Sequence, residues 1–275
     1  MSERRVAILG GGKMGEALLS GLLRSGWEAG EIRVTCRREE RAADLLERFG
    51  VSATLDNREA VGWASTLVVT VKPQDIEALL SEIAGAVTED HVLVSVAAGI
   101  RCALIEERIA AQVPVVRVMS NVPVHVDEAM SVISPGAHAD DKDLAVAEEL
   151  LGSVGKVIRL PEKHQDAVTA TSGSGPAYFA LLAEAMIDAC ILLGLDRDVA
   201  TELIVQTMAG SAKMLRDMKK HPVELREMVT SPGGTTIVAI RELEQAGVRA
   251  AFLNAIDAAR QRSAELAKGS DAEEI

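Results

Sequence analysis

The feature that most constrains this chain is an alternation of short β-branched runs with longer amphipathic stretches, which extends from Val6 to about Leu160. The strand-like runs are Val6–Leu9, Ile32–Cys36, Thr66–Val71, His91–Val96 and Val115–Met119, with weaker ones at Met130–Ser134 and Lys156–Leu160. Helical patterns between them include Gly15–Arg24, Glu39–Phe49 and Gln74–Ala86. This order predicts right-handed βαβ units. Because the runs are apolar without alternation, they predict a parallel sheet covered on both faces.

After Pro161 the strand signals stop and the pattern becomes helical. A first helical stretch is expected over Gln165–Leu193, interrupted by a loop at residues 172–176, and a second from Asp196 or Asp198 to about Lys220. Further helices are expected over Glu224–Val229, Thr235–Gln245 and Val248–Lys268. The acidic tail that follows is expected to fray. The sequence therefore predicts an α/β domain over residues 1–160 and an all-α domain over residues 161–275.

The stretch Pro176–Leu193 is apolar on nearly every face, with only Glu184 and Asp188 interrupting it. Such a helix either spans a membrane or is buried among other helices. Its two acids, its length and the absence of flanking basic residues favour burial over a membrane span. Because a small helical half has little interior, the pattern predicts a homodimer formed through the helical domain.

Composition limits the partners and the location. The chain has 41 Asp and Glu against 29 Lys and Arg, a formal charge of −12 with no basic block, which argues against binding to nucleic acid or to anionic lipid. Cys36, Cys102 and Cys190 are scattered and the five histidines lack ligand spacing, so no metal site is expected. The charged start Met1–Arg5 lacks a signal-peptide pattern, so we expect a cytoplasmic protein.

Glycines recur directly after the first predicted strand as Gly10-x-Gly12-x-x-Gly15. In a dinucleotide-binding unit the first glycine allows a tight turn, the second lets the backbone approach a pyrophosphate, and the third lets the helix pack on the sheet. The helix N-terminus then directs free amides at the anion, which also brings Lys13 and Met14 to the cofactor. A glycine turn without a ligand is the alternative, but the position between a strand and an amphipathic helix favours a Rossmann-like dinucleotide-binding domain.

The second predicted strand ends in Arg37-Arg38, where NAD-specific folds usually carry an acid for the ribose 2′-hydroxyl. A guanidinium at this position pairs with a 2′-phosphate, so the pair predicts a preference for NADPH, with NADH as the alternative donor. The competing interpretation is a solvated pair of surface arginines.

Lys72 follows the third long strand-like run, with Pro73 after it. The carboxyl end of a strand is where ligands bind in open α/β sheets, which favours a role for Lys72 at the cofactor. An exposed lysine at a strand end is an equally simple interpretation.

The segment Thr230–Thr236 contains Gly233-Gly234 just before a predicted helix. Turned amides, a helix N-terminus and nearby hydroxyls suit a carboxylate, although an ordinary helix connection with a threonine cap has the same composition. The earlier loop around Ser174 lacks the strand-to-helix context of a nucleophile elbow and has no histidine base in evidence.

Taken together, these residues resemble the pyrroline-5-carboxylate reductase family over almost the whole chain. The matching motifs are Gly10-x-Gly12-x-Met14-Gly15, Val71-Lys72-Pro73, Ala97-Ala98-Gly99-Ile100, Ser172-Gly-Ser-Gly-Pro-Ala-Tyr178, Gln206-Thr207, Ala212-Lys213-Met214, His221-Pro222, Val229-Thr-Ser-Pro-Gly-Gly-Thr-Thr-Ile237 and Gly247-x-Arg249. The resemblance implies reduction of L-1-pyrroline-5-carboxylate to L-proline by NADPH or NADH, the last step of proline biosynthesis. It also implies a helical dimerisation domain and, in many members, dimers assembled into rings such as a pentamer of dimers.

The resemblance also implies roles for individual residues. Thr236 resembles the hydroxyl that hydrogen-bonds the ring nitrogen, and it is the catalytic candidate. The implied substrate-side residues are Ser231, Gly233, Gly234 and Thr235, which would hold the carboxylate, together with Ser174. The implied cofactor-side residues are Asn57, Val71, Lys72, Pro73, Ala98, Gly99 and Asn121.

One segment departs from the family pattern. The family usually reads Arg-x-Met-Pro-Asn-Thr-Pro, whereas this chain has Ser120 in place of the first proline and Val122 in place of the threonine; Asp127-Glu128-Ala129 also replaces a glycine-containing turn. Two alternatives therefore stay open at this point. One is a reductase of another cyclic imine or of a small hydroxy acid on the same architecture, and the other is a non-catalytic NADP-binding protein whose helical half is an interaction platform.

Overall fold

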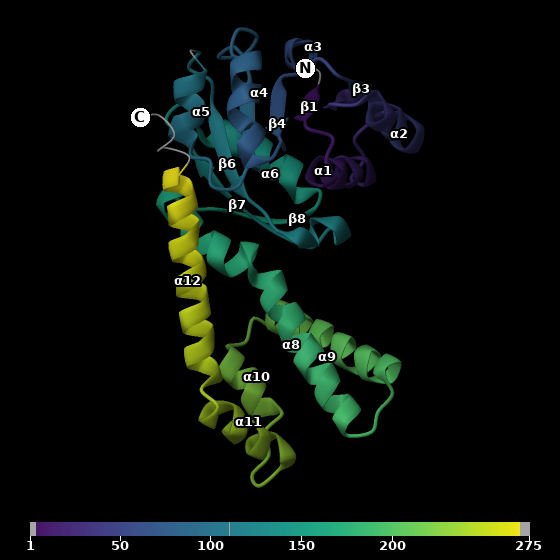
Figure 1. The fold of residues 1–275 in the computed structure, drawn as a ribbon, viewed down its shortest axis with the longest axis vertical. Helices are drawn as coiled ribbons and strands as arrows, with labels where there is room; N and C mark the ends of the chain where they lie inside the picture. The colour runs from purple at the N-terminus through teal and green to yellow at the C-terminus, as the bar shows by residue number, and fades with distance from the viewer. Residues whose placement is uncertain (1–3, 110, 270–275) are drawn as a thin grey trace. The chain divides into compact units, whose positions relative to one another are not determined.

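The computed structural model describes residues 4–109 and 111–269, and the chain divides into two compact units (Figure 1). The first comprises the residues up to Ser174 together with the described residues from Ala259 on, and the second comprises Gly175–Ala258. The expectation for the acidic tail falls mostly outside the described residues, as does most of the predicted start of the chain. The division by contacts lies fourteen residues beyond the predicted boundary after residue 160 and returns the end of the last helix to the first unit.

Among the described residues, the first unit contains an eight-stranded sheet with the order β3-β2-β1-β4-β5-β6-β7-β8. The strands are β1 Val6–Leu9, β2 Ile32–Thr35, β3 Ser52–Thr54, β4 Thr66–Val69, β5 Val92–Ser95, β6 Val115–Met119, β7 Ala129–Pro135 and β8 Gly155–Arg159. The order reverses between β1 and β4, which creates the crevice where open α/β sheets bind their ligands. All neighbouring pairs are parallel except β6 and β7, so the expectation of a wholly parallel sheet was wrong at that pair.

Helices cover both faces of this sheet. They are α1 Lys13–Arg24, α2 Glu39–Phe49, α3 Asn57–Trp63, α4 Ile76–Ile83, α5 Cys102–Arg108, α6 Asp141–Gly152 and the short α7 Gln165–Val168. Alternate residues of β1 point to opposite faces: Val6 and Ile8 pack with α1, α2 and α6, whereas Ala7 and Leu9 pack with α3, α4 and α5. The predicted coverage of both faces is therefore confirmed, and it explains why the strand sequences are apolar without alternation.

The predicted interruption at residues 172–176 is not a loop. Residues Thr169–Gly173 form a π-helical turn that joins α7 to α8 (Gly175–Leu192), and Ser174 N donates to Thr169 O at 2.8 Å in the pattern of that turn. Gly173 lies beside the flexible end of the Met119 side chain, whose Cε would be 2.4 Å from a Cβ at that position. The segment therefore continues the helical path between α7 and α8.

The second unit is helical and contains few buried residues. It consists of α8, α9 Arg197–Met218, α10 Pro222–Met228, α11 Thr235–Gln245 and the first part of α12 Val248–Gly269. Ala200 and Ile204 on α9 are buried, whereas Phe179, Leu181 and Leu192 on α8 are 62%, 67% and 88% exposed. By length and composition alone, the helical stretch Glu162–Leu192 qualifies as a candidate membrane span, and the core helix of a soluble protein meets the same criterion.

Candidate active site

The glycine-rich turn after β1 is held by two threonines, Thr35 at the end of β2 and Thr70 directly after β4. Gly10 has a φ of +119° and its amide donates to Thr35 Oγ1 at 3.1 Å, while Thr70 Oγ1 donates to Gly10 O at 2.6 Å. A Cβ on Gly15 would lie 2.2 Å from Gly10 O. The turn therefore requires glycine at Gly10 for its backbone conformation and at Gly15 for the approach of α1 to the turn.

Gly12 presents the opposite situation, because a Cβ added there would meet no protein atom within 4 Å. Gly12 is also the N-cap residue of α1, and no side chain caps the helix there. The first amides of an α-helix have no partner within the helix, so this end of α1 offers free donors beside open space. These features fit the pyrophosphate of a dinucleotide.

The turn borders a cavity of about 1200 Å³ at the carboxyl ends of β1, β2 and β4. Eight of the residues predicted for the cofactor line it: Gly10, Gly12, Lys13, Arg37, Arg38, Asn57, Val71 and Lys72. Six do not line it, namely Met14, Gly15, Pro73, Ala98, Gly99 and Asn121. The residues fit a dinucleotide, since a cavity of this size lies between a phosphate-binding turn and two arginines.

Arg37 and Arg38 lie between the end of β2 and the first residue of α2. The side chain of Arg37 is 83% exposed and Nη1 is 3.5 Å from Asp75. Arg38 is exposed and is the N-cap residue of α2. Both guanidinium groups are therefore accessible at one end of the cavity, where an anionic group can pair with them.

Asn57 and Lys72 line the cavity from two further elements. Asn57 is the first residue of α3, and its Nδ2 donates to Glu82 Oε2 at 2.9 Å. Lys72 precedes a 3₁₀ turn over Pro73–Asp75, and its carbonyl accepts from the Asp75 amide at 2.9 Å. The loop after β5 includes Gly99, whose φ of +78° places it in the left-handed region.

Asn121 makes its side-chain contacts within the protein. Its Nδ2 donates to Ser172 O at 3.1 Å, and its Oδ1 accepts from the Met130 amide at 2.9 Å. It therefore ties the end of β6 to β7 and to the π-helical turn. This contact set assigns the side chain an internal bridging role that the sequence did not reveal.

Two of the residues that depart from the family pattern, Ser120 and Asp127, contact side chains elsewhere in the first unit. Ser120 Oγ lies 3.0 Å from Ser131 Oγ on β7, so the serine hydroxyl is satisfied. Asp127 has a φ of 59°, a conformation that favours glycine, and its carboxylate pairs in bidentate fashion with Arg24 at 2.9 Å and 2.5 Å. Val122 is 65% exposed, and nothing in the structure explains its choice.

The substrate-side candidates of the second unit lie on one turn. Gly233 has a φ of +69°, and the Gly234 amide donates to Ser231 O at 3.1 Å. Gly234 is the N-cap residue of α11, which begins at Thr235 without a side-chain cap. The turn therefore brings Ser231, Thr235 and Thr236 to the uncapped N-terminus of an eleven-residue helix. Ser174, the remaining candidate, ends the π-helical turn in the first unit.

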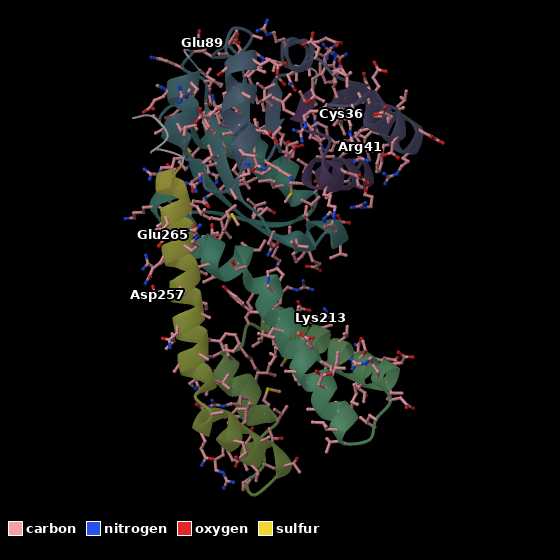
Figure 2. The ribbon with its side chains drawn as sticks, in the orientation of Figure 1. Cys36, Arg41, Glu89, Lys213, Asp257 and Glu265 are labelled. Atoms are coloured by element: carbon pink, nitrogen blue, oxygen red, sulfur yellow. The ribbon has the colours of Figure 1, made fainter. Side chains whose placement is uncertain are left out.

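Sequence reasoning missed several residues that line this cavity, and four of them hold the glycine-rich turn directly or through one another. These are Thr35, Thr70, Glu16 and Arg41. Arg41 Nε donates to Gly11 O at 2.8 Å, and its guanidinium pairs with Glu16 and Asp44. Figure 2 labels Arg41 and Cys36, which both line the cavity. No helical spacing pointed to Arg41, because Arg37 precedes α2 and does not share a helix face with it.

Burial and neighbouring charges shift the pKa of Glu16, Cys102 and Cys36. Burial opposes ionisation of Glu16, but hydrogen bonds from Arg41 and Arg48 hold the pKa of that carboxyl below its usual value. Burial and the nearby Glu162 carboxylate raise the pKa of the Cys102 thiol to about 12, and burial also raises the pKa of Cys36, which lines the cavity. Within the described ranges, no cluster of three or more His, Cys, Asp or Glu could hold a metal ion.

The sheet order, the phosphate-binding turn and the cavity beside it define a protein of the Rossmann class with a site for a dinucleotide such as NAD(P)H. Two family descriptions match the chain: "NADP oxidoreductase coenzyme F420-dependent" over residues 5–99 and "Pyrroline-5-carboxylate reductase dimerisation" over residues 162–266. The pyrroline-5-carboxylate reductase of Corynebacterium melassecola is 45% identical over 96% of this chain and 98% of its own length. That of Methanosarcina acetivorans is 41% identical over 98% of this chain and 100% of its own.

Solved structures give the same result. A pyrroline-5-carboxylate reductase from Coxiella burnetii matches with a TM-score of 0.91 and 33% identity, covering 96% of this chain and 99% of that chain. The Plasmodium falciparum pyrroline carboxylate reductase with NADP bound matches with a TM-score of 0.86 and 26% identity, over 97% and 99%. The chain belongs to the pyrroline-5-carboxylate reductase family. The predicted fold class is confirmed, with a Rossmann-like sheet followed by the helical dimerisation domain of that family.

Proposed function

We propose that this chain reduces L-1-pyrroline-5-carboxylate to L-proline, the last step of proline biosynthesis, with NADPH preferred over NADH. The observation that carries the proposal is the identity of 41% to 45% with pyrroline-5-carboxylate reductases over almost the whole of both chains. The bound NADP of the Plasmodium falciparum relative supports the choice of cofactor.

The cofactor is held by the first unit. The amides of Gly12, Lys13 and Met14 bind the pyrophosphate, and Gly10 and Gly15 shape the turn that presents them. Arg37 and Arg38 pair with the 2′-phosphate, an interaction that a free 2′-hydroxyl does not make. The adenosine side includes Asn57, and the strand-end segment Val71-Lys72-Pro73 lies along the cofactor. Ala98, Gly99 and Asn121 belong to the nicotinamide side, where Asn121 acts through the segments that it joins.

The substrate carboxylate is bound by the turn of the second unit, through Ser231, Gly233, Gly234 and Thr235, with Ser174 as a further polar contact. An uncapped helix N-terminus with two hydroxyls beside it suits this anion. Thr236 hydrogen-bonds the ring nitrogen, which places the imine carbon for attack.

When bound, NADPH supplies the hydride for the C=N bond. A protonated imine is already electrophilic, so the protein requires no strong general acid. A site built from amides and hydroxyls meets that requirement, and Thr236 orients the ring nitrogen or relays its proton. Holding both reactants in place is itself a large contribution to rate.

The assembly follows from the exposed apolar side chains of the second unit. The family description matched there is a dimerisation domain, and Phe179 and Leu181 on α8 lie exposed in the single chain. We place α8 in a homodimer interface and not in a membrane, with a pentamer of dimers as the larger assembly. The predicted domains, 1–160 and 161–275, and the cytoplasmic location belong to the same proposal.

The first test is oxidation of NADPH and of NADH by the purified protein with L-1-pyrroline-5-carboxylate, followed by the loss of reduced-nicotinamide absorbance. Turnover with NADPH preferred supports the reaction and the role of the two arginines. Binding of NADPH without turnover of this imine would overturn the proposed substrate.

Two variants then separate the roles. Thr236→Ala should lower kcat by tens to about a thousand fold, the range for one positioned polar group, with cofactor affinity unchanged. Thr201→Ala, which removes an exposed helical threonine of the same unit, is the matched control. Arg37→Ala should weaken NADPH far more than NADH, and an equal loss for both would remove the 2′-phosphate assignment.

A further inference from the structure

Arg41 is the arginine of the cavity most fully engaged with the protein. Its side chain is 25% exposed, against 83% for Arg37. Its Nε donates to Gly11 O at 2.8 Å, Nη2 pairs with Glu16 and Nη1 pairs with Asp44. The guanidinium is therefore fixed from three directions, one of which is the glycine-rich turn itself.

The contact with Gly11 O bears on the next amide of the chain. In a planar trans peptide the carbonyl of Gly11 and the N–H of Gly12 point in opposite directions. Arg41 holds the carbonyl on the side of α2, and the Gly11 amide is held by Thr35 O at 2.6 Å. With both polar groups of Gly11 anchored, the Gly12 N–H is left on the other side of the peptide, where Gly12 borders the cavity.

The charges around Arg41 balance. Glu16 and Asp44 both pair with Arg41 and also with Arg48, so two carboxylates and two guanidinium groups form one closed network. Arg41 therefore adds little net charge to the cavity. Arg37 and Arg38, which lie outside this network, are left to recognise an anionic group.

We propose that Arg41 is a positioning residue for the phosphate-binding turn: it anchors the carbonyl of Gly11 so that the Gly12 amide faces the pyrophosphate of the cofactor, and Glu16 holds Arg41 in that position. The proposal deepens the cofactor part of the proposed function. It assigns Arg41 to the portion of the cofactor that NADPH and NADH share, and it leaves the 2′-phosphate to Arg37 and Arg38. Reading cofactor affinity in the absence of substrate keeps the test independent of whether the imine is turned over.

The test measures the Kd of NADPH, NADH and adenosine 2′-monophosphate by titration of full-length protein, without substrate. Arg41→Ala should raise the Kd of both dinucleotides by the same factor, about tenfold or more, the usual effect of losing one hydrogen bond to a charged group. The Kd of adenosine 2′-monophosphate, which has no pyrophosphate, should change less than about twofold. Arg48→Ala is the matched control, since Arg48 pairs with the same two carboxylates but does not contact the turn.

Two further variants guard against a general loss of structure. Glu16→Gln keeps the size of the side chain and should raise both dinucleotide Kd values by a smaller, equal factor of about threefold. Arg41→Lys retains the charge but cannot make the three directed contacts, so it should not restore wild-type affinity. A loss confined to NADPH, or an equal loss for adenosine 2′-monophosphate, would make Arg41 a 2′-phosphate ligand and overturn the proposal. Unchanged Kd values in both Arg41 variants, or an equal effect of Arg48→Ala, would also overturn it.

Discussion

The chain contains two glycine turns that each lead into an uncapped helix, and their surroundings differ. The turn Gly10–Gly15 is fixed by Thr35, Thr70 and Arg41 from three other segments of the first unit. In the turn Ser231–Gly234, the hydrogen bond from the Gly234 amide to Ser231 O is local, and Gly233 has no atom within 4 Å of a Cβ built on it. The first turn is thus built by its own unit, whereas the second is shaped by local backbone geometry.

The two units also differ in how completely their apolar side chains are buried. Both faces of the sheet around the first turn are fully packed, with Ile8 and Leu9 inaccessible to solvent. The helices around the second turn leave apolar side chains such as Leu181 exposed. A fold that completes its core within one chain can also complete a binding site within one chain. The second unit requires more protein around it, which a second copy supplies in the proposed dimer.

The largest expected effect comes from closing the space at Gly15. In Gly15→Ala the new Cβ would lie 2.2 Å from Gly10 O, a backbone atom that cannot rotate away. We expect a loss of about 3 kcal/mol in the free energy of unfolding, at the upper end of the range for overpacking, together with a large loss of NADPH affinity. Chemical denaturation and dinucleotide titration measure the two effects.

Gly12→Ala is the matched control for that change, because its Cβ meets no protein atom and its φ of −79° suits alanine. Its stability should stay within about 1 kcal/mol of wild type, whereas NADPH affinity should fall because the methyl group occupies the pyrophosphate site. Equal destabilisation by the two alanines would contradict the assigned division of roles between Gly12 and Gly15.

The next effect tests the incomplete packing of the second unit. Leu181→Glu places a charge on α8 and should shift the protein from dimer to monomer, with a loss of about 2 kcal/mol per subunit from the leucine no longer buried between copies. Light scattering coupled to gel filtration measures the oligomeric state. Leu46→Glu on α2, where the leucine is 57% exposed, is the control and should leave the dimer intact. A dimer that tolerates Leu181→Glu would exclude that face of α8 from the interface.

The sequence predicted those features of the two turns that are set by the local backbone conformation. Gly10 and Gly15 could be assigned because a tight turn and a close helix leave no room for a side chain. Thr70 and Arg41 were missed because their roles depend on neighbours that only the folded chain brings together. The strand β7 was predicted at Met130–Ser134, but its antiparallel pairing with β6 was not, since a run of apolar residues carries no sign of direction. The three-residue β3 at the sheet edge is too short to produce a pattern.

A smaller effect is expected at Gly233, where the φ of +69° imposes a cost on any L-residue. Gly233→Ala should lower stability by about 1 kcal/mol through backbone strain alone, since no atom lies close to the new Cβ. It should also raise the KM for L-1-pyrroline-5-carboxylate while leaving the NADPH Kd unchanged. Gly15→Ala is expected to weaken NADPH binding, whereas Gly233→Ala is expected to affect only the KM for the imine. Steady-state kinetics and cofactor titration measure these two quantities. A weakened NADPH Kd in Gly233→Ala would show that the second turn does not serve the substrate alone.

The smallest effect is a pH dependence confined to the first turn. The folded-state pKa of Glu16 lies below its usual value of 4.5, so between these two values the unfolded chain binds more protons than the folded one. The stability that Glu16 contributes through Arg41 and Arg48 is therefore complete above about pH 5 and is lost as the pH falls through the lowered pKa. The difference in Tm between wild type and Glu16→Gln should narrow as the pH is lowered over that range, by an amount that corresponds to less than about 1 kcal/mol for a partly exposed group. A difference in Tm that stays constant down to about pH 3 would mean that Glu16 acts through packing and not through its charge.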